Sequence, residues 1–500
     1  MAGQIDDMND LRNTRRAAWS LLRHAPVWLA ILGLAAVAGY YAEGHQDRVL
    51  MLAALLLFGT LSLYWATRPD VLANHRWIPY AWIALALAPD HRFQFHSTDP
   101  SLSNLSPENI AQAVIYAVVA GLVLHARRML VSRDRRTIRT GPLMAWPLFA
   151  LASTIWSLVP LFTFVRALQL FVPIGLAIVM VRLWLDSPER AAELWRETLR
   201  RFVGVVTLLI LVGFALGFWR DFQFSWPGAH PGTAGMYIAG GLMILLAAGN
   251  TFLGLRRSGY VFRVLLFAFS LYLGEARGVL AGVLVGLGVM LWYFARQNPL
   301  KSYIGLTYYV LAIGLVLLAA SPELLQYALK GGTIEGITSL DGRIPLWTQS
   351  IELLSNGGKW LFGFGYGSAR ILLPKYFYWA GTAHSSWVEW LMAGGVLGLL
   401  LASADILFLA WRSSSRRSLM PPALTMSLIA LLVVVSTASE GLSFPGVMFT
   451  MVAFLHAPVL AEWNSRRLDQ VSLGFAQYSR GAASAVRPTR SLARRYWQLR

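Results

Sequence analysis

Long apolar runs recur along this 500-residue chain, and short segments rich in arginine separate them. The runs are about 16–22 residues long, which is enough for a helix to cross the hydrocarbon core of a bilayer. Only 14% of the residues are charged and 56% are hydrophobic. A soluble protein of this length carries roughly a quarter charged residues. The pattern therefore predicts an all-α membrane protein that crosses the bilayer many times.

The net charge of +18 comes mainly from arginines that cluster between the apolar runs. Basic residues beside spans favour the cytoplasmic side, so this distribution indicates membrane topology rather than nucleic-acid binding. The strongest cluster places six arginines within residues 127–139. Because the chain has no cysteine, disulfides, thiolate chemistry and cysteine-ligated metals are excluded. The polar, basic start of the chain predicts no cleavable signal peptide.

The hydropathy pattern predicts about fourteen spans between residues 27 and 463, with both termini in the cytoplasm. Residues 1–26 form a basic N-terminal segment, and residues 464–500 form a basic, partly disordered tail that anionic lipids attract. An inner amphipathic segment is expected at residues 187–201, and a long periplasmic loop at 321–385. The predicted spans are 27–42, 49–66, 77–89, 109–125, 143–158, 162–185, 202–218, 234–249, 264–273, 279–294, 304–320, 387–410, 423–437 and 447–463.

The long loop contains the most unusual polar stretch of the chain. Residues 343–355 have apolar residues at helical spacing, which predicts an amphipathic helix on the membrane surface. Gly357 and Gly358 would end that helix, and the glycines of residues 363–367 would allow an irregular backbone. This glycine stretch resembles a phosphate loop only in composition, because no Lys-Ser or Lys-Thr pair follows it. A nucleotide site is therefore not expected there.

Arginines on the outer side run against the positive-inside bias and need another explanation. Arg277 lies in a five-residue turn between two spans, and Arg343 begins the predicted surface helix. Arg166 lies a few residues inside a span, where an unpaired charge costs a few kcal/mol. Snorkelling or contact with lipid headgroups is the alternative for any single one of these arginines. The basic residues expected outside are Arg48, Arg92, Arg220, Arg277, Arg343, Arg370, Lys330, Lys359 and Lys375.

His384 lies where the long loop enters the next span, and it is a candidate general base because its pKa is near working pH. A hydrogen-bonded interface histidine is the alternative. His230, on another outer segment, is a second and weaker candidate. No metal-binding motif is present in the outer segments, so metal-independent chemistry without a cofactor is the simpler expectation. The acidic residues there are scattered: Asp221, Glu275, Glu335, Asp341 and Glu440.

Outer arginines together with one base suit the transfer of a group from an anionic leaving group. A lipid-linked pyrophosphate needs fixed positive charge as it departs, and an acceptor hydroxyl needs a proton acceptor. In a partly dehydrated membrane pocket, a fixed cation can stabilise such a transition state by several kcal/mol.

An ordered set of motifs over residues 150–460 resembles the bacterial O-antigen ligase and O-antigen polymerase superfamily. Each motif alone is loose, but the ordered set is fairly specific. Glu275 and Ala276 stand where hydroxyl residues are common in that family, and Gly232 stands where asparagine is common. The motifs are Trp156–Pro160 with Thr163 and Arg166, His230-Pro231-Gly232, Glu275–Gly278, Asp341-Gly342-Arg343 with Trp347, Leu361–Gly367, and His384 with Trp387, Glu389 and Gly394–Gly398.

This resemblance implies a GT-C-like, inverting glycosyltransferase that takes a glycan from undecaprenyl diphosphate at the periplasmic face of the inner membrane. On that implication, Arg277 and Arg343 would hold the diphosphate and His384 would activate the acceptor hydroxyl. The acceptor would be a sugar of the lipid A-core in a ligase, and the end of another lipid-linked repeat in a polymerase. Further substrate contacts are expected from Arg166, Arg220, His230, Trp347 and Tyr366.

Two other kinds of protein remain open. A transporter of lipid-linked glycans would spread important polar residues through its spans and over both faces, whereas here the unusual ones gather outside. The chain also lacks a long internal repeat, which is common in transporters. An oligosaccharyltransferase that glycosylates proteins shares the core motifs, but it usually has an extra outer C-terminal domain. The tail of this chain is expected inside.

Overall fold

The computed structural model describes residues 75–89, 107–131, 138–220, 223–226, 229–274, 276–297, 342–414 and 420–465. Helices dominate these residues. The main helices, in chain order, are α4 (Ile78–Leu87), α5 (Pro107–Val131), α6 (Ala145–Ala152), α7 (Pro160–Asp186), α8 (Pro188–Ala215), α9 (Pro231–Leu253), α10 (Arg257–Leu273), α11 (Arg277–Gln297), α15 (Arg343–Asn356), α17 (Ser386–Ser413), α18 (Pro422–Ser436) and α19 (Val447–Asn464).

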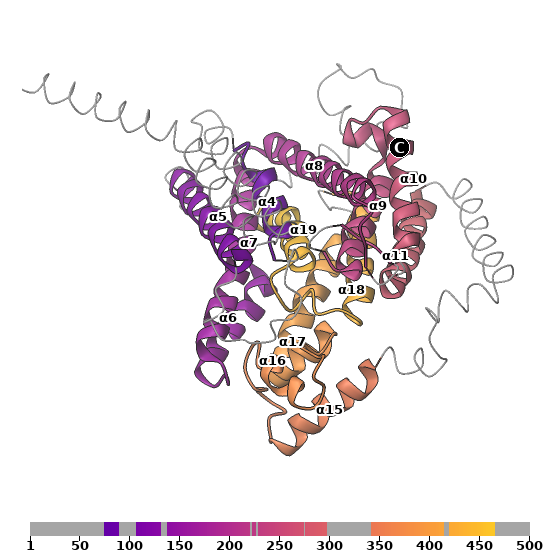
Figure 1. The fold of residues 1–500 in the computed structure, drawn as a ribbon. Helices are drawn as coiled ribbons and strands as arrows, with labels where there is room; N and C mark the ends of the chain where they lie inside the picture. Colours follow the sequence, from indigo (N-terminus) through magenta and orange to yellow (C-terminus); the bar gives the residue numbers. More distant parts are fainter. Residues whose placement is uncertain are drawn as a thin grey trace, which may run out of the picture.

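Smaller elements join these helices. They are the short helix α16 (Ala369–Leu372), the 3₁₀ helices η1 (Gly141–Met144), η2 (Ser153–Ile155) and η3 (Leu373–Lys375), and the antiparallel strands β1 (Trp219–Arg220) and β2 (Gln223–Phe224). Figure 1 shows a broad helical bundle that narrows toward one end, where α15 and α16 lie against the start of α17. We call residues 342–385 the cap.

Six described helices are long and apolar enough to cross a membrane: α7, α8, α9, α11, α17 and α19. They support the predicted all-α membrane protein, but not a count of fourteen spans. The expected spans 27–42, 49–66 and 304–320 lie outside the described residues, as do the N-terminal segment and nearly all of the tail.

The predicted inner segment at 187–201 and the span at 202–218 form one continuous helix, α8. The separation of these two elements was wrong. Glu197 forms ion pairs with Arg200 at 2.5 Å and with Arg201 at 2.6 Å, one helical turn away. Because such pairs stabilise helical backbone, the charged turn continues directly into the apolar one.

The predicted span at 143–158 corresponds to η1, α6 and η2, which follow one another without a gap and form one apolar helical segment, Gly141–Ile155. Its end carries Ser153, whose hydroxyl joins the segment to the cap. The Ser153 hydroxyl donates to the carbonyl of Ala150 at 2.7 Å and accepts the N–H of Tyr366 at 3.0 Å. Hydropathy cannot predict this contact between the segment and the cap, because it depends on a residue far away in the sequence.

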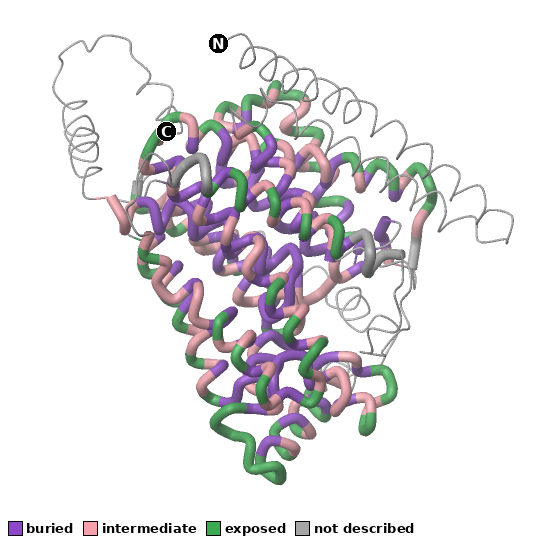
Figure 2. Tube along the Cα trace, turned by 90° about the vertical axis from the view of Figure 1, so that its left-hand side faces the viewer, coloured by how far each residue is buried: buried purple, intermediate pink, exposed green. Residues whose placement is uncertain are grey.

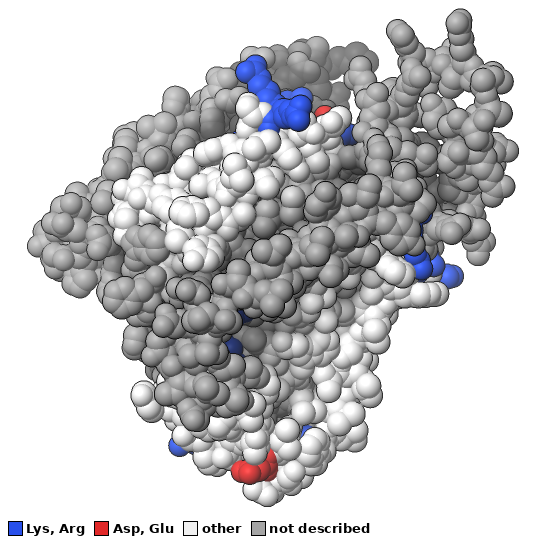
Figure 3. All heavy atoms as spheres, turned by 90° about the vertical axis from the view of Figure 1, so that its right-hand side faces the viewer, with Lys and Arg blue, Asp and Glu red and all other residues white. Residues whose placement is uncertain are grey.

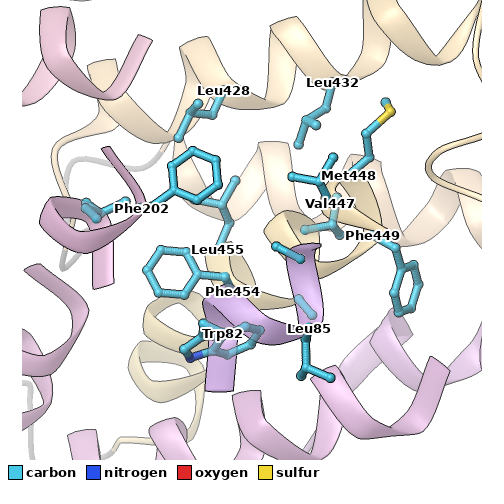
Figure 4. Packing of buried hydrophobic residues seen from close by; sticks show 14 of the residues in the cluster. Trp82, Leu85, Phe202, Leu428, Leu432, Val447, Met448, Phe449, Phe454 and Leu455 are labelled. Carbon is cyan, nitrogen blue, oxygen red and sulfur yellow. The ribbon is translucent and has the colours of Figure 1, made fainter. Parts of the chain in front are cut away.

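The apolar core lies at the centre of the bundle, where α4, α8, α18 and α19 meet. Figure 4 shows Trp82, Phe202 and Phe454 turned toward one another there. Trp195 stacks on Phe454 with ring centroids 5.2 Å apart. In Figure 2, buried residues run through the centre of the bundle and into the cap. The core therefore gives the cap a continuous support.

Helix α17 is broken at Gly395, which has φ +62°. The glycine stretch of the cap pairs with the backbone at the break. The N–H groups of Phe364 and Gly365 donate to the carbonyls of Met392 and Ala393 at 2.8 and 2.9 Å. Since lipid offers no partner for freed backbone groups, a broken span needs partners of this kind. The break and the glycine stretch therefore depend on each other.

This pairing requires close approach of two backbones. A Cβ added at Gly363, where φ is +63°, would lie 2.5 Å from the carbonyl oxygen of Met392. One added at Gly395 would collide with the carbonyl of Trp360, whose oxygen accepts the N–H of Val396 at 2.7 Å. The irregular backbone expected at residues 363–367 thus allows this segment to lie directly against the broken helix.

The described part of the long loop is a folded unit with its own small core. The predicted helix at residues 343–355 is confirmed as α15. Leu346 and Leu354 of this helix are buried in the cap, and its place on a membrane surface stays a prediction. The core of the cap consists of Leu346, Leu354, Ala369, Leu373, Ala380 and Ala383, together with Met392 of α17.

We expect Gly395→Ala to lower the free energy of unfolding by at least about 2 kcal/mol, because a side chain in the left-handed region alone costs roughly 1–2 kcal/mol. The added methyl would also meet the carbonyl of Trp360. The apparent melting temperature of the purified protein in detergent measures the effect. Gly381→Ala is the matched control, since a Cβ there has no atom within 4 Å. An unchanged melting temperature for Gly395→Ala would contradict this account of the break.

Candidate active site

His384 occupies a strained turn between the cap and α17. Its φ of +50° is uncommon for a residue with a side chain. The preceding residue, Ala383, is held on both sides: its N–H donates to Glu389 Oε2 at 3.1 Å, and its carbonyl accepts Trp347 Nε1–H at 2.9 Å. Strained residues that their surroundings hold in place are concentrated at functional sites. The conformation therefore supports His384 as a candidate for chemistry.

The ring of His384 has one face and one nitrogen in contact with the protein. It stacks on Trp379 at 5.8 Å with an interplanar angle of 21°, and its Nδ1 lies 3.6 Å from Glu440 Oε2. In the neutral ring, a carboxylate at Nδ1 favours the proton on that nitrogen and leaves Nε2 as the base. The His384 side chain is 34% exposed, so solvent or a substrate can reach it.

Charges around His384 change its pKa in opposite directions. Burial alone would lower the pKa of His384, but the carboxylate of Glu440 outweighs it and raises this pKa overall; Arg343 acts against the rise. Burial would raise the pKa of Glu440, but His384 and Arg370 hold it well below its usual range. At neutral pH Glu440 is therefore ionised and stabilises the protonated imidazole.

Glu440 reaches His384 because the turn between α18 and α19 is bonded to the start of α17. The backbone N–H and the hydroxyl of Ser386 both donate to the carbonyl of Ser439, at 2.9 and 2.8 Å. The N–H of Leu442 donates back to the Ser386 hydroxyl at 3.1 Å. In the sequence, Glu440 is only one of several scattered acidic residues. The one available signal was that its turn was expected on the same side as His384.

Arg343 lies on the same side of the molecule as His384. It is the first residue of α15, and the preceding Gly342 has φ +80°. A Cβ added to Gly342 would lie 3.5 Å from the ring of Trp379, which is the ring that stacks on His384. Arg343 also contributes to the electrostatic environment of His384. The structure thus places Arg343 and Trp347 beside the His384 turn, and their roles in a reaction stay predictions.

Arg277 begins α11, beside the turn that carries Glu440. A Cβ added at Gly278 would lie 3.5 Å from that of Ala438, two residues before Glu440. Further along α11, one added at Gly282 would lie 2.8 Å from Val435 of α18. Small residues at this spacing let membrane helices approach closely. The packing of α11 on α18 therefore places the Arg277 end near Glu440.

A second pair of arginines shares one aromatic ring. Arg166 lies over Phe162 at 5.5 Å and donates to Gln169 Oε1 at 3.0 Å. Arg370 lies over the same ring at 5.6 Å and over Phe444 at 5.1 Å. Because Arg370 also lowers the pKa of Glu440, it is part of the charge balance around His384. From the sequence, Arg370 is predicted only as an outer arginine, without a role in the site.

The remaining candidates are less directly placed. Tyr366 is fully buried between Trp146 and Phe444, and its hydroxyl donates to the carbonyl of Ser443 at 2.9 Å. In this structure it supports the Glu440 turn and has no surface for a substrate. His230 precedes α9, and its Nδ1 accepts the N–H of Gly232 at 3.1 Å. Arg220 ends β1, and its side chain is outside the described part of the structure.

Metal binding was not expected, and that expectation stays a prediction. Within the described residues, no three histidine, aspartate or glutamate side chains gather as a metal site would require. What the described site contains is a base paired with a carboxylate, with guanidinium groups nearby. This arrangement can accept a proton and bind an anion.

We expect His384 to titrate at higher pH than an ordinary histidine, because Glu440 stabilises its protonated form, and Glu440→Gln to move the titration to lower pH. Histidine ring NMR signals of labelled protein in nanodiscs measure this, with His384→Gln identifying the signal. Glu352→Gln, on the exposed face of α15, is the control and should leave the midpoint unchanged. A midpoint that does not respond to Glu440→Gln would contradict the pairing.

Comparison with known proteins agrees with the motifs. Residues 262–403 match the family model described as O-Antigen ligase. This range contains Arg277, Arg343, Trp347, His384 and Glu389. No curated protein matches the chain. The family match agrees with the resemblance expected from the ordered motifs: residues 262–403 are similar to the O-antigen ligase family and support the O-antigen ligase and O-antigen polymerase superfamily.

Proposed function

We propose that this protein is an O-antigen ligase-like glycosyltransferase of the bacterial inner membrane. It transfers a glycan from undecaprenyl diphosphate to a hydroxyl of a lipid A-core sugar at the periplasmic face. The observation that carries the proposal is His384 itself. The ring is partly exposed, its Nδ1 faces Glu440, and the arginine at the start of α15 acts on it from the cap.

In the proposed reaction, Nε2 of His384 accepts the proton of the acceptor hydroxyl as its oxygen attacks the anomeric carbon. A new carbon–oxygen bond forms there, and the bond from the same carbon to the diphosphate breaks. The electron pair stays on the diphosphate, whose growing charge Arg343 and Arg277 stabilise. Attack from the face opposite the leaving group inverts the anomeric centre.

Glu440 has a definite part in this scheme. It keeps the neutral His384 protonated on Nδ1, and it stabilises the imidazolium that forms when Nε2 takes the proton. Guanidinium groups bind phosphate oxygens in pairs of hydrogen bonds, so they suit a diphosphate without a metal ion. Arg166 and Arg370 both lie over the ring of Phe162, and we propose that they bind a further part of the same substrate.

The distribution of charge supports the proposed orientation. Figure 3 shows a group of basic side chains at the end of the molecule opposite the cap and an acidic group at the tip of the cap. On α8, the basic residues include Arg190, Arg196, Arg200 and Arg201. The positive-inside rule assigns that end to the cytoplasm and leaves the cap, with His384, on the outer side. The cap would then lie away from ATP.

One observation favours a second candidate, a transporter of lipid-linked glycans. Asp405 of α17 and His456 of α19 lie 3.0 Å apart inside the bundle, where His456 is fully buried. Ionisable residues within spans often mark transport pathways. The two candidates differ in whether a glycosidic bond forms, so a purified protein that joins donor to acceptor excludes transport as the whole function.

The acceptor decides between the proposed ligase and a polymerase of the same superfamily. Deletion of the gene, followed by analysis of the surface polysaccharide, distinguishes the two. Free lipopolysaccharide core together with leftover undecaprenyl-linked polymer would identify a ligase. Core that bears a single repeat would identify a polymerase.

We expect His384→Ala and Arg343→Ala each to reduce glycan transfer at least about a hundredfold, because a general base and a charge stabiliser each contribute on that scale. The assay uses purified protein, lipid-linked donor and lipid A-core acceptor. Lys359→Ala removes an exposed cation of the cap and is the matched control. Near-normal transfer by both variants would rule out this mechanism.

The proposed orientation has its own test. A reporter fused after Ser355 should be active in the periplasm, and one fused after Arg133 should be active in the cytoplasm. The reason is that arginines cluster around the second position and avoid the first. The opposite pair of results would place His384 on the cytoplasmic side and would overturn the proposed donor face.

A further inference from the structure

A buried carboxylate lies directly behind the His384 turn. Glu389, in the first turns of α17, is fully buried. Its Oε2 accepts the N–H of Ala383 at 3.1 Å, while its Oε1 has no hydrogen-bond partner within the described residues. Burial of a carboxyl group with one oxygen unused is costly. Packing alone would favour an apolar residue at this position.

The one bond that Glu389 makes is with the residue next to the proposed base. Ala383 is fixed through its N–H by Glu389 and through its carbonyl by Trp347. These two bonds set the direction in which the chain enters His384, whose left-handed conformation needs support. Without these two hydrogen bonds the turn could relax, and the imidazole would move away from its position between Trp379 and Glu440.

We propose that Glu389 is a positioning residue for His384: its hydrogen bond to Ala383 holds the left-handed turn that presents the imidazole to the substrate. The inference rests on the proposed function, because it assumes that His384 is the base. Glu389 itself does not touch the substrate, since it is fully buried.

Charge gives a second, independent sign of this coupling. Three charged groups act on Glu389. They are Glu440 in the turn between α18 and α19, Arg370 in the cap, and His384 just before α17. In return, Glu389 is one of the groups that raise the pKa of His384. Replacing the carboxylate with a neutral amide should therefore change the titration of His384 even where the turn is preserved.

Two variants separate the hydrogen bond from the charge. Glu389→Gln keeps a side-chain oxygen that can accept the N–H of Ala383, whereas Glu389→Leu removes the acceptor at similar size. We expect Glu389→Leu to lower kcat for glycan transfer at least about tenfold, since small misplacements of a catalytic group are costly. KM for the lipid-linked donor should stay unchanged, because Glu389 does not contact it.

We expect Glu389→Gln to keep most of kcat while the acid limb of its pH–rate profile moves to lower pH. The direction follows because the ionised form of Glu389 favours protonated His384, so the basic form of His384 persists at lower pH once that form is removed. A residue with only a structural role would leave the midpoint in place. Glu352→Gln and Glu352→Leu, on the exposed face of α15, are the matched controls.

Either of two results would overturn the inference. One is full kcat in a folded Glu389→Leu protein; the other is equal loss of kcat in both variants with no change in the pH midpoint. The NMR titration of His384 keeps this test separate from the proposed function, because it needs no turnover. A lower midpoint in Glu389→Gln without any transfer by the native protein would support the coupling and reject the glycosyltransferase.

Discussion

The backbone hydrogen bonds between the glycine stretch and the broken helix α17 are the constraint on which the site depends. At Gly395 the helix turns, and the carbonyls of Met392 and Ala393 accept N–H groups from residues 363–367. These bonds attach the cap to the bundle inside an apolar environment, where unpaired backbone groups are costly. The first turns of α17, which carry Glu389 and follow His384, are held between the break and the cap.

Around that frame, three separate segments contribute charge to one histidine. The turn before α19 supplies Glu440, the cap supplies Arg343, and α17 supplies Glu389. Glu440 faces Nδ1 of His384 with its carboxylate, Arg343 acts on the ring through its charge, and Glu389 holds the turn through the backbone of Ala383. This arrangement fixes the ring nitrogen that faces outward and raises the pKa of His384. A base of this kind suits the proposed proton transfer, and the nearby guanidinium groups suit a departing diphosphate.

Sequence alone predicted the elements whose partners are local. Hydropathy identified α7 and α17, helical periodicity identified α15, and the motifs led to the family that residues 262–403 match. It failed where a long-range partner decides the structure. The contact of Ser153 with the backbone of Tyr366 and the bonds of Ser386 that hold the Glu440 turn could not be found from local composition. Such pairings join residues that are far apart in the sequence, so local composition does not predict them.

An experimental structure with an undecaprenyl diphosphate-linked glycan bound would test the central claim most directly. The account predicts phosphate oxygens within hydrogen-bond distance of Arg343 and Arg277, with Nε2 of His384 facing the anomeric carbon from the opposite side. A diphosphate bound at the other end of the bundle, among Arg196, Arg200 and Arg201, would contradict it.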